Sequence, residues 1–538
     1  MSSVGKGIAS ASIAKLLQAR GYNSTCVKAD PYINVDAGTM NPTEHGEVFV
    51  TDSGDECDQD IGNYERFLNT HIGSSNYMTT GRVYQSVIER ERNLEYGGKC
   101  VEVIPHIPRE IIRRIECASK ESNAEITTIE IGGTVGEYQN QLFLEAGRMM
   151  KLENPDDVMF VMVSYLPVPG NVGEMKTKPT QFAMRTLNSS GIQADILLAR
   201  APEPLDDRRK EKLSVFCNLT SKNIISAPDV DSIYDIPINF MKEDLDERII
   251  EILNLPSRSQ RNGELAEWRE FSRKTKSFSK KIKIGVIGKY FKTGDYILGD
   301  VYVSVLHAIK HAAWAQSCNP EIEYISSDHF EGENLDFDVL DNLDGIIVPG
   351  GFGTRGVDGI INVIRYSRER GIPLLGICYG MQLICVEYSR NVAEIMDANT
   401  EEVDENSKNL IIHVMQHQKK HLSEQKYGGT MRLGAYPCKL EIGSIAASLY
   451  TMFEVQERHR HRLEFNNNYR EKLESAGLRF SGLSPDGSLV EIVEVSNHPF
   501  LVGCQFHPEF LSRPMHPHPL FHGLLSAAII RSKKVELL

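Results

Sequence analysis

Short apolar runs alternate with amphipathic stretches along the first half of the chain. The runs are rich in β-branched side chains and occur at 24–30, 126–131, 158–167, 194–200 and 223–228. Such runs, separated by helical patterns, are typical of a parallel sheet that helices cover on both faces. The first half of the chain therefore predicts an α/β domain.

A polar and basic segment at 257–281 interrupts this pattern. It has few aliphatic residues and predicts a linker, with a candidate helix near 265–271. A second α/β series follows at 282–290, 343–353, 371–391 and 500–510. We expect two α/β domains, residues 1–256 and 282–538, joined by the linker 257–281.

Composition narrows the function classes. The chain has 538 residues, of which 41% are apolar, and a formal charge of −14, which argues against a general nucleic-acid binder. Its ten cysteines form no Cys-x-x-Cys pair, so the sequence indicates neither a zinc framework nor a disulfide scaffold. We therefore expect a reducing compartment. No apolar run approaches the roughly 20 residues that cross a bilayer, and no cleavable signal pattern is present, so we expect a cytoplasmic protein without a membrane partner.

A cysteine in the second half has the setting of a nucleophile. The segment "PLLGICYGMQLICVEYS" places Cys378 between two glycines, after an apolar run and before a helical pattern. A sharp strand-to-helix turn would put its sulfur at a helix N-terminus, where thiolate is favoured over thiol. Most cysteines are structural, and Cys385 has no such frame.

The base and its orienting group are sought in "QFHPEF". His507 and Glu509 lie two residues apart near a strand end, so we expect them to share one side of that strand. The glycine-rich turn at 348–353 could supply amides that stabilise an oxyanion. Together the three features indicate acyl transfer by a Cys–His–Glu set.

The chain begins with "MSSVGKGIAS", in which Gly5-Lys6-Gly7 precedes a helical run that Gly21 closes. Small residues in a first turn let the backbone approach phosphate oxygens, and Lys6 would add charge. The carboxylate-rich segment 28–67 and "EIGGTVGE" at 130–137 contain Asp60 and Glu130, which with phosphate oxygens make a plausible Mg²⁺ site. A solvated loop is the alternative for the acidic stretch.

The second half resembles the class I glutamine amidotransferases. That resemblance implies that Cys378 attacks the amide of glutamine, that His507 moves the proton and that Glu509 orients His507. It further implies roles in the oxyanion hole or in glutamine binding for Gly351, Tyr379, Gln382, Glu402 and Arg462. Taken alone, the Arg/His run at 457–466 could instead be a solvated charged face.

The whole chain resembles the CTP synthase family. The blocks "DPYINVDAGTM", "GNYERF", "IEIGGTVG", "KTKPTQ", "ERHRHR" and "QFHPEFLSRP" match that family in its order. The resemblance implies a P-loop-type synthetase domain that phosphorylates UTP with ATP, followed by displacement of phosphate by ammonia from L-glutamine to give CTP.

Nucleotide and metal sites follow from the same resemblance. For ATP they are Ser2, Gly5, Lys6, Gly7, Ile8, Asp60, Asp229 and Val230, with Lys28 near the transferred phosphoryl group. For UTP, or the inhibitor CTP, they are Ser2, Glu137, Gln139, Lys176, Lys178, Gln181 and Lys212. Asp60 and Glu130 would bind Mg²⁺, His45 and Val48 would line an ammonia passage, and Arg355 with Gly356 would sense the activator GTP. The family forms homotetramers that can stack into filaments.

Three departures from the family pattern stand out. The strand that usually precedes the phosphate loop is absent, and we expect this to destabilise the first domain and weaken ATP binding. The usual acidic pair after "GGTVG" reads Glu137-Tyr138-Gln139, which affects the expected pyrimidine contact, and 289–305 carries about four extra residues that could alter GTP activation. Two alternatives remain open: a P-loop ligase that amidates cobalamin precursors, and a non-catalytic or glutaminase-only filament subunit.

Overall fold

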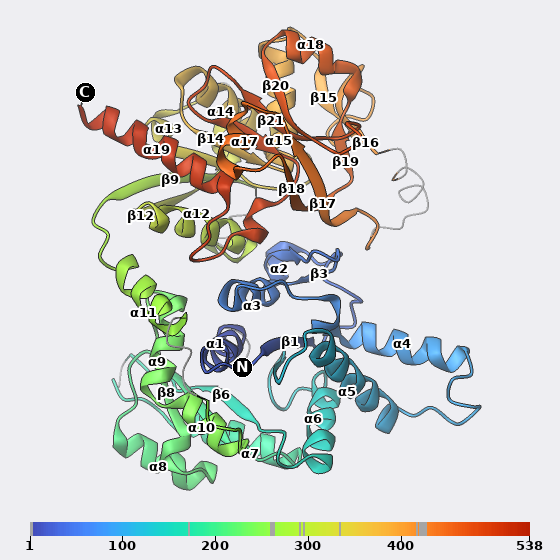
Figure 1. Cartoon of the computed structure of the whole chain (residues 1–538), viewed down its shortest axis with the longest axis vertical. Helices are drawn as coiled ribbons and strands as arrows, with labels where there is room; N and C mark the ends of the chain where they lie inside the picture. The colour runs from blue at the N-terminus through green and yellow to red at the C-terminus, as the bar shows by residue number, and fades with distance from the viewer. Residues whose placement is uncertain are drawn as a thin grey trace. The chain divides into compact units, whose positions relative to one another are not determined.

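The structure is a computed structural model that describes residues 4–170, 173–258, 264–289, 292–293, 296–297, 299–332, 335–415, 418 and 428–537. Contacts within the chain divide it into two units (Figure 1). The first unit comprises Met1–Asp36 and Asn63–Arg273, and the second comprises Ala37–Gly62 and Lys274–Leu538. The segment 37–62, which we assigned to the first domain from sequence, thus makes its contacts with the second half of the chain.

Two parallel three-stranded sheets form the first unit. One has the order β4 (Tyr77–Thr79), β1 (Ser24–Asp30), β5 (Ile126–Ile131), and the other has the order β6 (Val161–Tyr165), β7 (Ile196–Ala201), β8 (Ile224–Pro228). The helices around them are α1 (Lys6–Ala19), α4 (Thr80–Arg92), α5 (Val103–Glu121), α6 (Gln141–Glu153), α7 (Lys178–Ser189), α8 (Asp207–Cys217), α9 (Ile236–Lys242) and α10 (Leu245–Ile252). The expected parallel α/β fold is confirmed.

Helix α1 has well-defined ends. It begins after Gly5, whose φ of 81° lies in the left-handed region, and it stops before Gly21, whose φ is 93°. The amide of Gly21 donates to the carbonyl of Gln18, and the amide of Tyr22 donates to that of Leu17. These two hydrogen bonds make a Schellman motif, which explains why a glycine ends the helix.

The predicted linker contains a helix, α11 (Glu264–Thr275), that is anchored to the first unit. Trp268 is 1% exposed, and its indole Nε1 donates to the carbonyl of Tyr234 at 2.8 Å. Its ring also lies 5.3 Å from that of Phe67. The polar composition of 257–281 did not indicate this anchor, because only a few apolar side chains, among them Leu265 and Trp268, are buried there.

A nine-stranded mixed sheet forms the core of the second unit. Its first five strands are parallel: β12 (Asn319–Ser326), β9 (Lys281–Gly288), β13 (Gly345–Val348), β14 (Leu374–Ile377) and β22 (Leu501–Cys504). Four antiparallel strands extend it: β21 (Val490–Val495), β20 (Leu478–Leu483), β17 (Arg432–Leu440) and β18 (Glu454–His461). A three-stranded sheet, β15 (Ala398–Thr400), β16 (Asn409–Val414) and β19 (Leu463–Phe465), completes this part of the unit.

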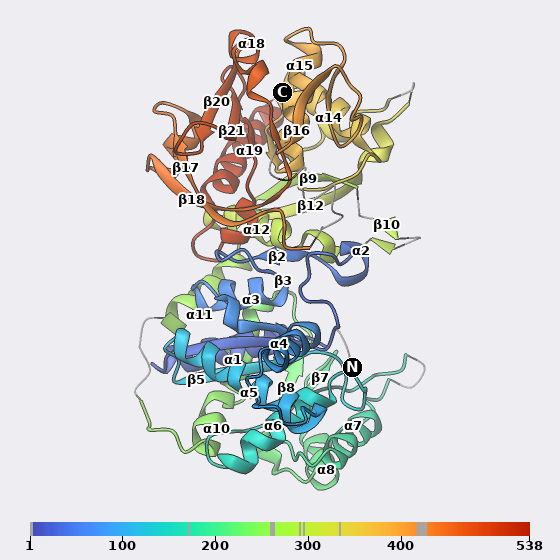
Figure 2. The ribbon, with the colours of Figure 1, turned by 90° about the vertical axis from the view of Figure 1, so that its right-hand side faces the viewer.

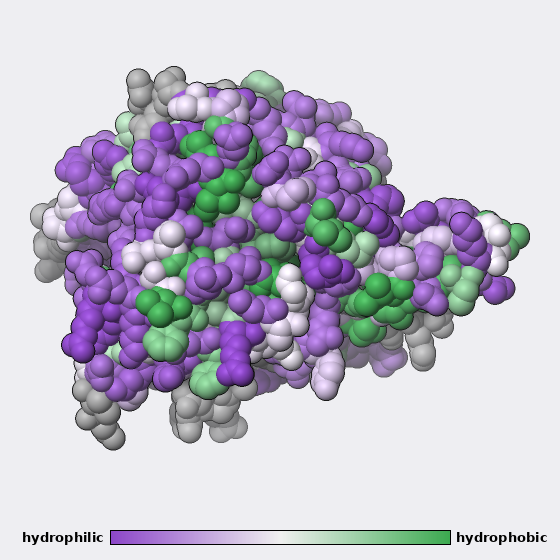
Figure 3. All heavy atoms as spheres, turned by 90° about the horizontal axis from the view of Figure 1, so that it is seen from below, coloured by the Kyte–Doolittle hydropathy of each residue, from purple (hydrophilic) through white to green (hydrophobic). Residues whose placement is uncertain are grey.

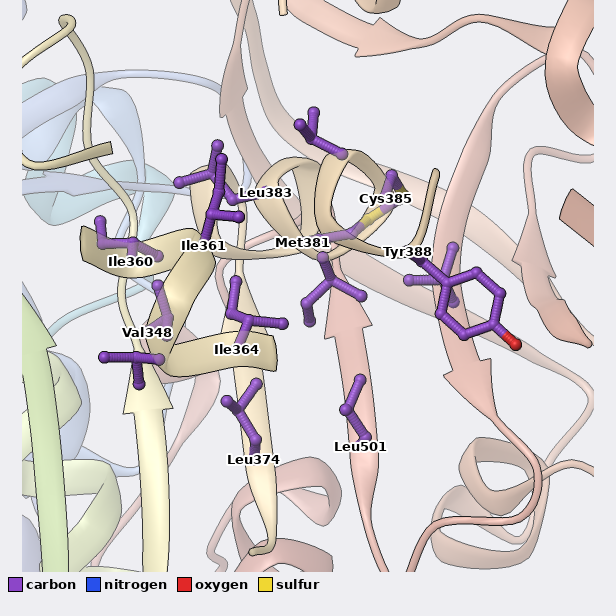
Figure 4. Close-up of a cluster of buried hydrophobic side chains, with 14 of the residues drawn as sticks. Val348, Ile360, Ile361, Ile364, Leu374, Met381, Leu383, Cys385, Tyr388 and Leu501 are labelled. Atoms are coloured by element: carbon purple, nitrogen blue, oxygen red, sulfur yellow. The ribbon is translucent and has the colours of Figure 1, made fainter. Parts of the chain in front are cut away.

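Apolar side chains between this sheet and two helices make one of the cores. The helices are α14 (Val357–Arg370) and α15 (Tyr379–Asn391). Figure 4 shows their side chains, Ile360, Ile361, Ile364, Met381, Leu383, Cys385 and Tyr388, against Val348, Leu374 and Leu501 of the strands. Cys385 therefore belongs to this core, and burial raises its pKa above the usual range of a thiol.

The charged run at 457–466 is not a solvated face. Its first half lies in β18, where Arg458 and His459 are fully buried. Arg458 Nε donates to Asp52 Oδ1 at 2.5 Å, and Arg460 Nε donates to Glu56 Oε1 at 2.8 Å. These bonds tie the hairpin of β2 (Val48–Val50) and β3 (Glu56–Asp58) to β18 within the second unit (Figure 2). The alternative weighed for this run from sequence is therefore wrong, because Arg458 and His459 are buried and carboxylates about 400 residues earlier in the chain compensate the charge of the arginines.

The surface is mainly hydrophilic on the face that Figure 3 shows, and its hydrophobic atoms form separate patches. Among the described residues, none of the helices combines the length and the apolar character needed to cross a bilayer.

Candidate active site

Cys378 lies on a tight turn between β14 and α15. Its φ of 50° and ψ of −99° are unusual for a residue with a side chain. A Cβ added to Gly376 would lie 2.9 Å from the carbonyl oxygen of Gly380, and one added to Gly380 would lie 2.3 Å from that of Val348. Only glycine fits at these two positions, so the predicted strand-to-helix turn is present and presents Cys378 at the N-terminus of α15.

His507 and Glu509 form a pair, although not by the expected route. Strand β22 ends at Cys504, and Glu509 lies in a 3₁₀ helix, η7 (Pro508–Leu511). This short helix, rather than a shared strand face, brings Glu509 Oε1 to 2.7 Å from His507 Nδ1. The prediction that they pair is met, but the strand geometry we expected is wrong, because the chain leaves the sheet before either residue.

The charge state of His507 reflects its surroundings. Burial alone would lower the pKa of His507, but the Glu509 carboxylate and the neighbouring Cys378 raise it to about 10. His507 Cε1 also lies so close to Gly350 that a Cβ there would be 2.8 Å away. The residues are thus suited to an imidazolium–thiolate pair, in which the sulfur is already a nucleophile.

The glycine-rich turn after β13 is held at Gly353 by three side chains. Its carbonyl accepts hydrogen bonds from Lys289 Nζ at 2.7 Å and from the Tyr379 hydroxyl at 3.0 Å. Its amide donates to Glu402 Oε1 at 2.5 Å, and burial raises the pKa of Glu402. Gly351, predicted for the oxyanion hole, lies two residues before this anchor. Lys289 was not predicted from the sequence, because it directly follows an ordinary β-strand, β9.

The other residues predicted for glutamine binding lie in the same unit. Arg462 donates to Thr430 Oγ1 at 2.8 Å and to Gln418 Oε1 at 3.1 Å. Gln382 is 3% exposed and donates to the carbonyl of Leu463 at 3.3 Å. Substrate contacts of these residues stay predictions.

Two further predicted regions also belong to the second unit. His45 is the exposed last residue of α2 (Pro42–His45), and Val48 is buried at the start of β2. Arg355 is exposed and paired with Asp328, and Gly356 has a φ of 71° at the start of α14. A Cβ on Gly356 would lie 2.2 Å from Ser327 Oγ, so this turn requires glycine. The extra residues near 294–300 lie partly outside the described residues.

In the first unit, the start of α1 meets the loop after β5. Lys6 Nζ donates to the carbonyl of Gly133 at 3.0 Å. The same loop contains Glu137, whose carboxylate accepts from the amide of Thr134 at 3.0 Å. Gly5, Gly7 and Ile8 lie at the first turn of α1, whereas Ser2 lies outside the described residues. Lys6 and the 130–137 segment are therefore brought together, as a phosphate site requires.

A buried charged cluster lies beside this loop. Lys28 on β1 is in register with Glu130 on β5, and Lys28 Nζ lies 3.0 Å from Glu130 Oε1 and 3.7 Å from Asp30 Oδ1. The Tyr64 hydroxyl donates to the second oxygen of Glu130. Asp60, the other predicted metal ligand, begins α3 (Asp60–Leu68) in the second unit. Its pairing with Glu130 stays a prediction.

Three of the predicted pyrimidine nucleotide contacts are lysines, of which Lys178 and Lys212 are exposed. Lys178 begins α7 and lies 5.6 Å from the ring of Phe216 on α8, the helix that also carries Lys212. Lys176 pairs with Glu174 at 2.6 Å, and Gln181 is 9% exposed. Gln139 is exposed on the loop after β5, while Asp229 follows β8 with Val230 and pairs with Arg200 at 2.7 Å.

Among the described residues, no group of three or more His, Cys, Asp and Glu side chains could hold a metal ion by itself. Mg²⁺ often takes only one or two protein carboxylates and completes its shell with water and phosphate oxygens. A carboxylate set that includes Glu130 fits this chemistry.

Comparison with known proteins matches both halves of the chain. Residues 1–255 match the family model of the CTP synthase N-terminus, and residues 297–527 match that of the class-I glutamine amidotransferases. A CTP synthase of Prochlorococcus marinus is 45% identical over 99% of this chain and 94% of its own length, and one of Syntrophus aciditrophicus is 46% identical over 100% and 97%. A solved glutaminase domain of Trypanosoma brucei CTPS with bound acivicin is 38% identical, covers 46% of this chain and 94% of that chain, and has a TM-score of 0.43.

Proposed function

The chain belongs to the CTP synthase family, and on that basis we propose how its residues divide the reaction between the two halves. The enzyme is a glutamine-hydrolysing ligase that aminates UTP to CTP at the expense of ATP. Cys378 and its partners release ammonia, and the phosphate-loop half activates UTP. One observation supports the glutaminase step above all. His507 is paired with Glu509 and interacts with Cys378, which lies on a strained turn.

In the glutaminase step, the Cys378 thiolate attacks the side-chain amide carbon of glutamine. The negative charge on the carbonyl oxygen is stabilised by amides of Gly351 and Tyr379. His507 gives its proton to the amide nitrogen as the carbon–nitrogen bond breaks, and ammonia leaves. Water, deprotonated by His507, then hydrolyses the thioester to release glutamate and restore the thiolate. Gln382, Glu402 and Arg462 would hold the amino acid.

In the synthetase step, the γ-phosphoryl group of ATP is transferred to the 4-oxygen of UTP, which converts a poor leaving group into a good one. Ammonia then adds to C4, phosphate departs and CTP forms. Lys6 at the start of α1 and Lys28 beside Glu130 are placed to balance phosphate charge. Asp60 and Glu130 would hold Mg²⁺, which would neutralise charge on the transferred phosphoryl group.

Ligand contacts beyond these belong to the same proposal. Lys176, Lys178, Gln181 and Lys212 would bind the triphosphate of UTP or of the inhibitor CTP, and Asp229 and Val230 would face the adenine. GTP would act as activator through the region of Arg355 and Gly356. A homotetramer capable of stacking into filaments is also proposed, and the ten free cysteines support a reducing, cytoplasmic location.

The decisive experiment measures CTP formation from UTP, ATP and Mg²⁺ with either glutamine or ammonia as nitrogen source. We expect both to support synthesis in the unaltered chain. Cys378→Ala should abolish the glutamine-dependent reaction and leave the ammonia-dependent one nearly intact, because the proposed ligase chemistry does not use Cys378. Equal loss of both activities would contradict this division. A glutaminase-only subunit, the alternative, would release glutamate but form no CTP from ammonia.

A further inference from the structure

The sulfur of Cys378 has two polar neighbours besides His507, and one of them is the carbonyl oxygen of Arg460 at 3.8 Å. The carboxamide Nε2 of Gln505 lies 3.6 Å from Cys378 Sγ, within hydrogen-bonding range for sulfur, and Gln505 is 1% exposed. Gln505 stands two residues before His507, in the segment that leaves β22. It therefore reaches the nucleophile from the same segment as the base.

The orientation of this carboxamide follows from its partners. The backbone carbonyl of Leu463 can only accept, so the side chain of Gln382, 3.3 Å away, must turn its NH₂ group toward it. The same NH₂ group lies 3.3 Å from Gln505, which must therefore present its oxygen. Since the oxygen of Gln505 faces Gln382, its own NH₂ group faces Cys378. The backbone carbonyl of Leu463 therefore determines, through Gln382, that Gln505 turns its NH₂ group toward the sulfur.

Three more contacts hold this hydrogen-bonded network in place. The Leu463 carbonyl also accepts from His461 Nδ1 at 2.8 Å, and His461 Nε2 lies 3.0 Å from His459 Nδ1. Burial lowers the pKa of His461 to about 3, so its ring stays neutral and keeps these roles across the working pH range. The backbone amide of Gln505 donates to the carbonyl of Glu491 at 2.8 Å, which fixes the position of its Cα.

From this geometry we propose that Gln505 is a catalytic residue of the glutaminase site: it donates a hydrogen bond to the Cys378 sulfur, stabilises the thiolate and aims it, with Gln382 as the residue that positions its carboxamide. A hydrogen bond to the charged form of an acid favours that form. His507, kept protonated by Glu509, supplies positive charge beside the same sulfur, whereas Gln505 supplies an oriented donor that does not titrate. This inference goes beyond the proposed triad and rests on it only for the identity of the nucleophile.

The test compares Gln505→Leu, which removes the donor at similar volume, with Gln505→Glu, which replaces the donor by an acceptor of the same shape. The rate of Cys378 alkylation by iodoacetamide, followed on the peptide that contains Cys378, is measured against pH in substrate-free protein. Among the described residues, His507 and Cys504 are titratable groups that interact with this cysteine, and both variants leave them unchanged.

We expect the pH midpoint of alkylation to rise by about one unit in Gln505→Leu, a tenfold loss of thiolate at a given pH, and by more in Gln505→Glu. Gln382→Leu should shift the midpoint in the same direction by less, because the carboxamide of Gln505 can then flip. The matched control is Gln316→Leu, which removes a half-buried carboxamide elsewhere in the second unit and should leave the midpoint unchanged.

Thermal unfolding of each variant separates folding from chemistry. If Gln505→Leu does not fold, Gln505→Met offers an unbranched replacement with the same expected shift. Midpoints in folded Leu, Met and Glu variants that equal that of the unaltered chain would overturn the proposal. Failure to form CTP would not affect this outcome, since alkylation needs neither UTP nor ATP.

Discussion

His507 Nδ1 lies 2.7 Å from Glu509 Oε1, and the 3₁₀ helix η7 sets that distance. Both side chains are buried, so the carboxylate acts on the imidazole with little screening by water. The pair orients the ring and fixes which nitrogen carries the proton. The other nitrogen, Nε2, is the one available to the substrate and the sulfur.

This pair predicts a pH dependence of stability. The folded-state pKa of His507, about 10, is higher than the roughly 6.5 of an unfolded histidine. Protonated His507 therefore stabilises the folded protein fully below about pH 6.5, and this contribution is lost as the pH rises through about 10. Thermal unfolding of the unaltered chain should show this loss between these two pH values, whereas His507→Gln should show a flatter profile.

Glu509→Gln provides the control for that prediction. Removing the carboxylate takes away the charge that raises the pKa of His507 against the effect of burial. The loss of stability should then be smaller and should end at lower pH than in the unaltered chain, because the unfolded-state pKa that sets its onset is unchanged. Profiles that coincide for the unaltered chain and both variants would mean that His507 is not held protonated by this contact.

The buried cluster of the first unit predicts a selective loss of synthesis. Glu130→Gln keeps the shape of the side chain but removes the charge that faces Lys28 at 3.0 Å. CTP formation should fall by at least about a hundredfold with either nitrogen source. The reason is that Glu130 would hold Mg²⁺, and without this ion the charge on the transferred phosphoryl group is no longer balanced. Glutamate release, which uses the other unit, should persist at least in part.

Glu145→Gln is the matched control for this change. Glu145 is in the first unit, where it pairs with Arg148 one turn along the same helix, and the loss of such a pair costs little. Its CTP formation should equal that of the unaltered chain. A Glu130→Gln variant that still makes CTP from ammonia at the normal rate would exclude Glu130 as a metal ligand.

Local features of the fold were predictable from the sequence. The glycine that ends α1 and the glycines around Cys378 mark turns by their spacing along the chain, so these turns could be predicted, although the contact of Gly380 with Val348 could not. Pairing of His507 with Glu509 was also predictable, because only one residue separates them. The sheet position we inferred for them was wrong, since alternation along a strand no longer applies once the strand has ended at Cys504.

Long-range compensation could not be predicted. The fully buried Arg458 is paired with Asp52, 406 residues earlier in the chain, and nothing local to either residue announces the other. For the same reason the antiparallel half of the sheet, which includes this charged strand, was missed. Gln505 belongs to the motif "QFHPEF", but its contact with Cys378 could not be predicted, because its orientation depends on Gln382 and on the backbone of Leu463.

The buried side chain of Trp268 predicts that α11 stabilises the first unit. Trp268→Ala removes a buried indole that contacts Phe67 and donates to the carbonyl of Tyr234. Such truncations cost about 3–5 kcal/mol, a large part of the stability of a typical domain. Denaturant unfolding should show a lower midpoint for the first unit. Trp268→Phe should cost less, and a Trp268→Ala variant as stable as the unaltered chain would show that 257–281 is only a tether.

The turn that carries Cys378 predicts the effect of a single added methyl group. In Gly380→Ala the new Cβ would lie 2.3 Å from the carbonyl oxygen of Val348 and 3.1 Å from its Cβ, and both belong to a central strand that cannot move freely. The turn must therefore open, at a cost of about 1–3 kcal/mol, and the sulfur moves away from His507. A misplacement of about 1 Å can cost a hundredfold in rate, so glutaminase activity should fall by about that factor.

CTP formation from ammonia should be retained, because it does not use Cys378. Gly170→Ala is the matched control, since a Cβ at Gly170 would meet no atom within 4 Å and should change neither activity. Full glutaminase activity in Gly380→Ala would mean that the nucleophile does not depend on this turn.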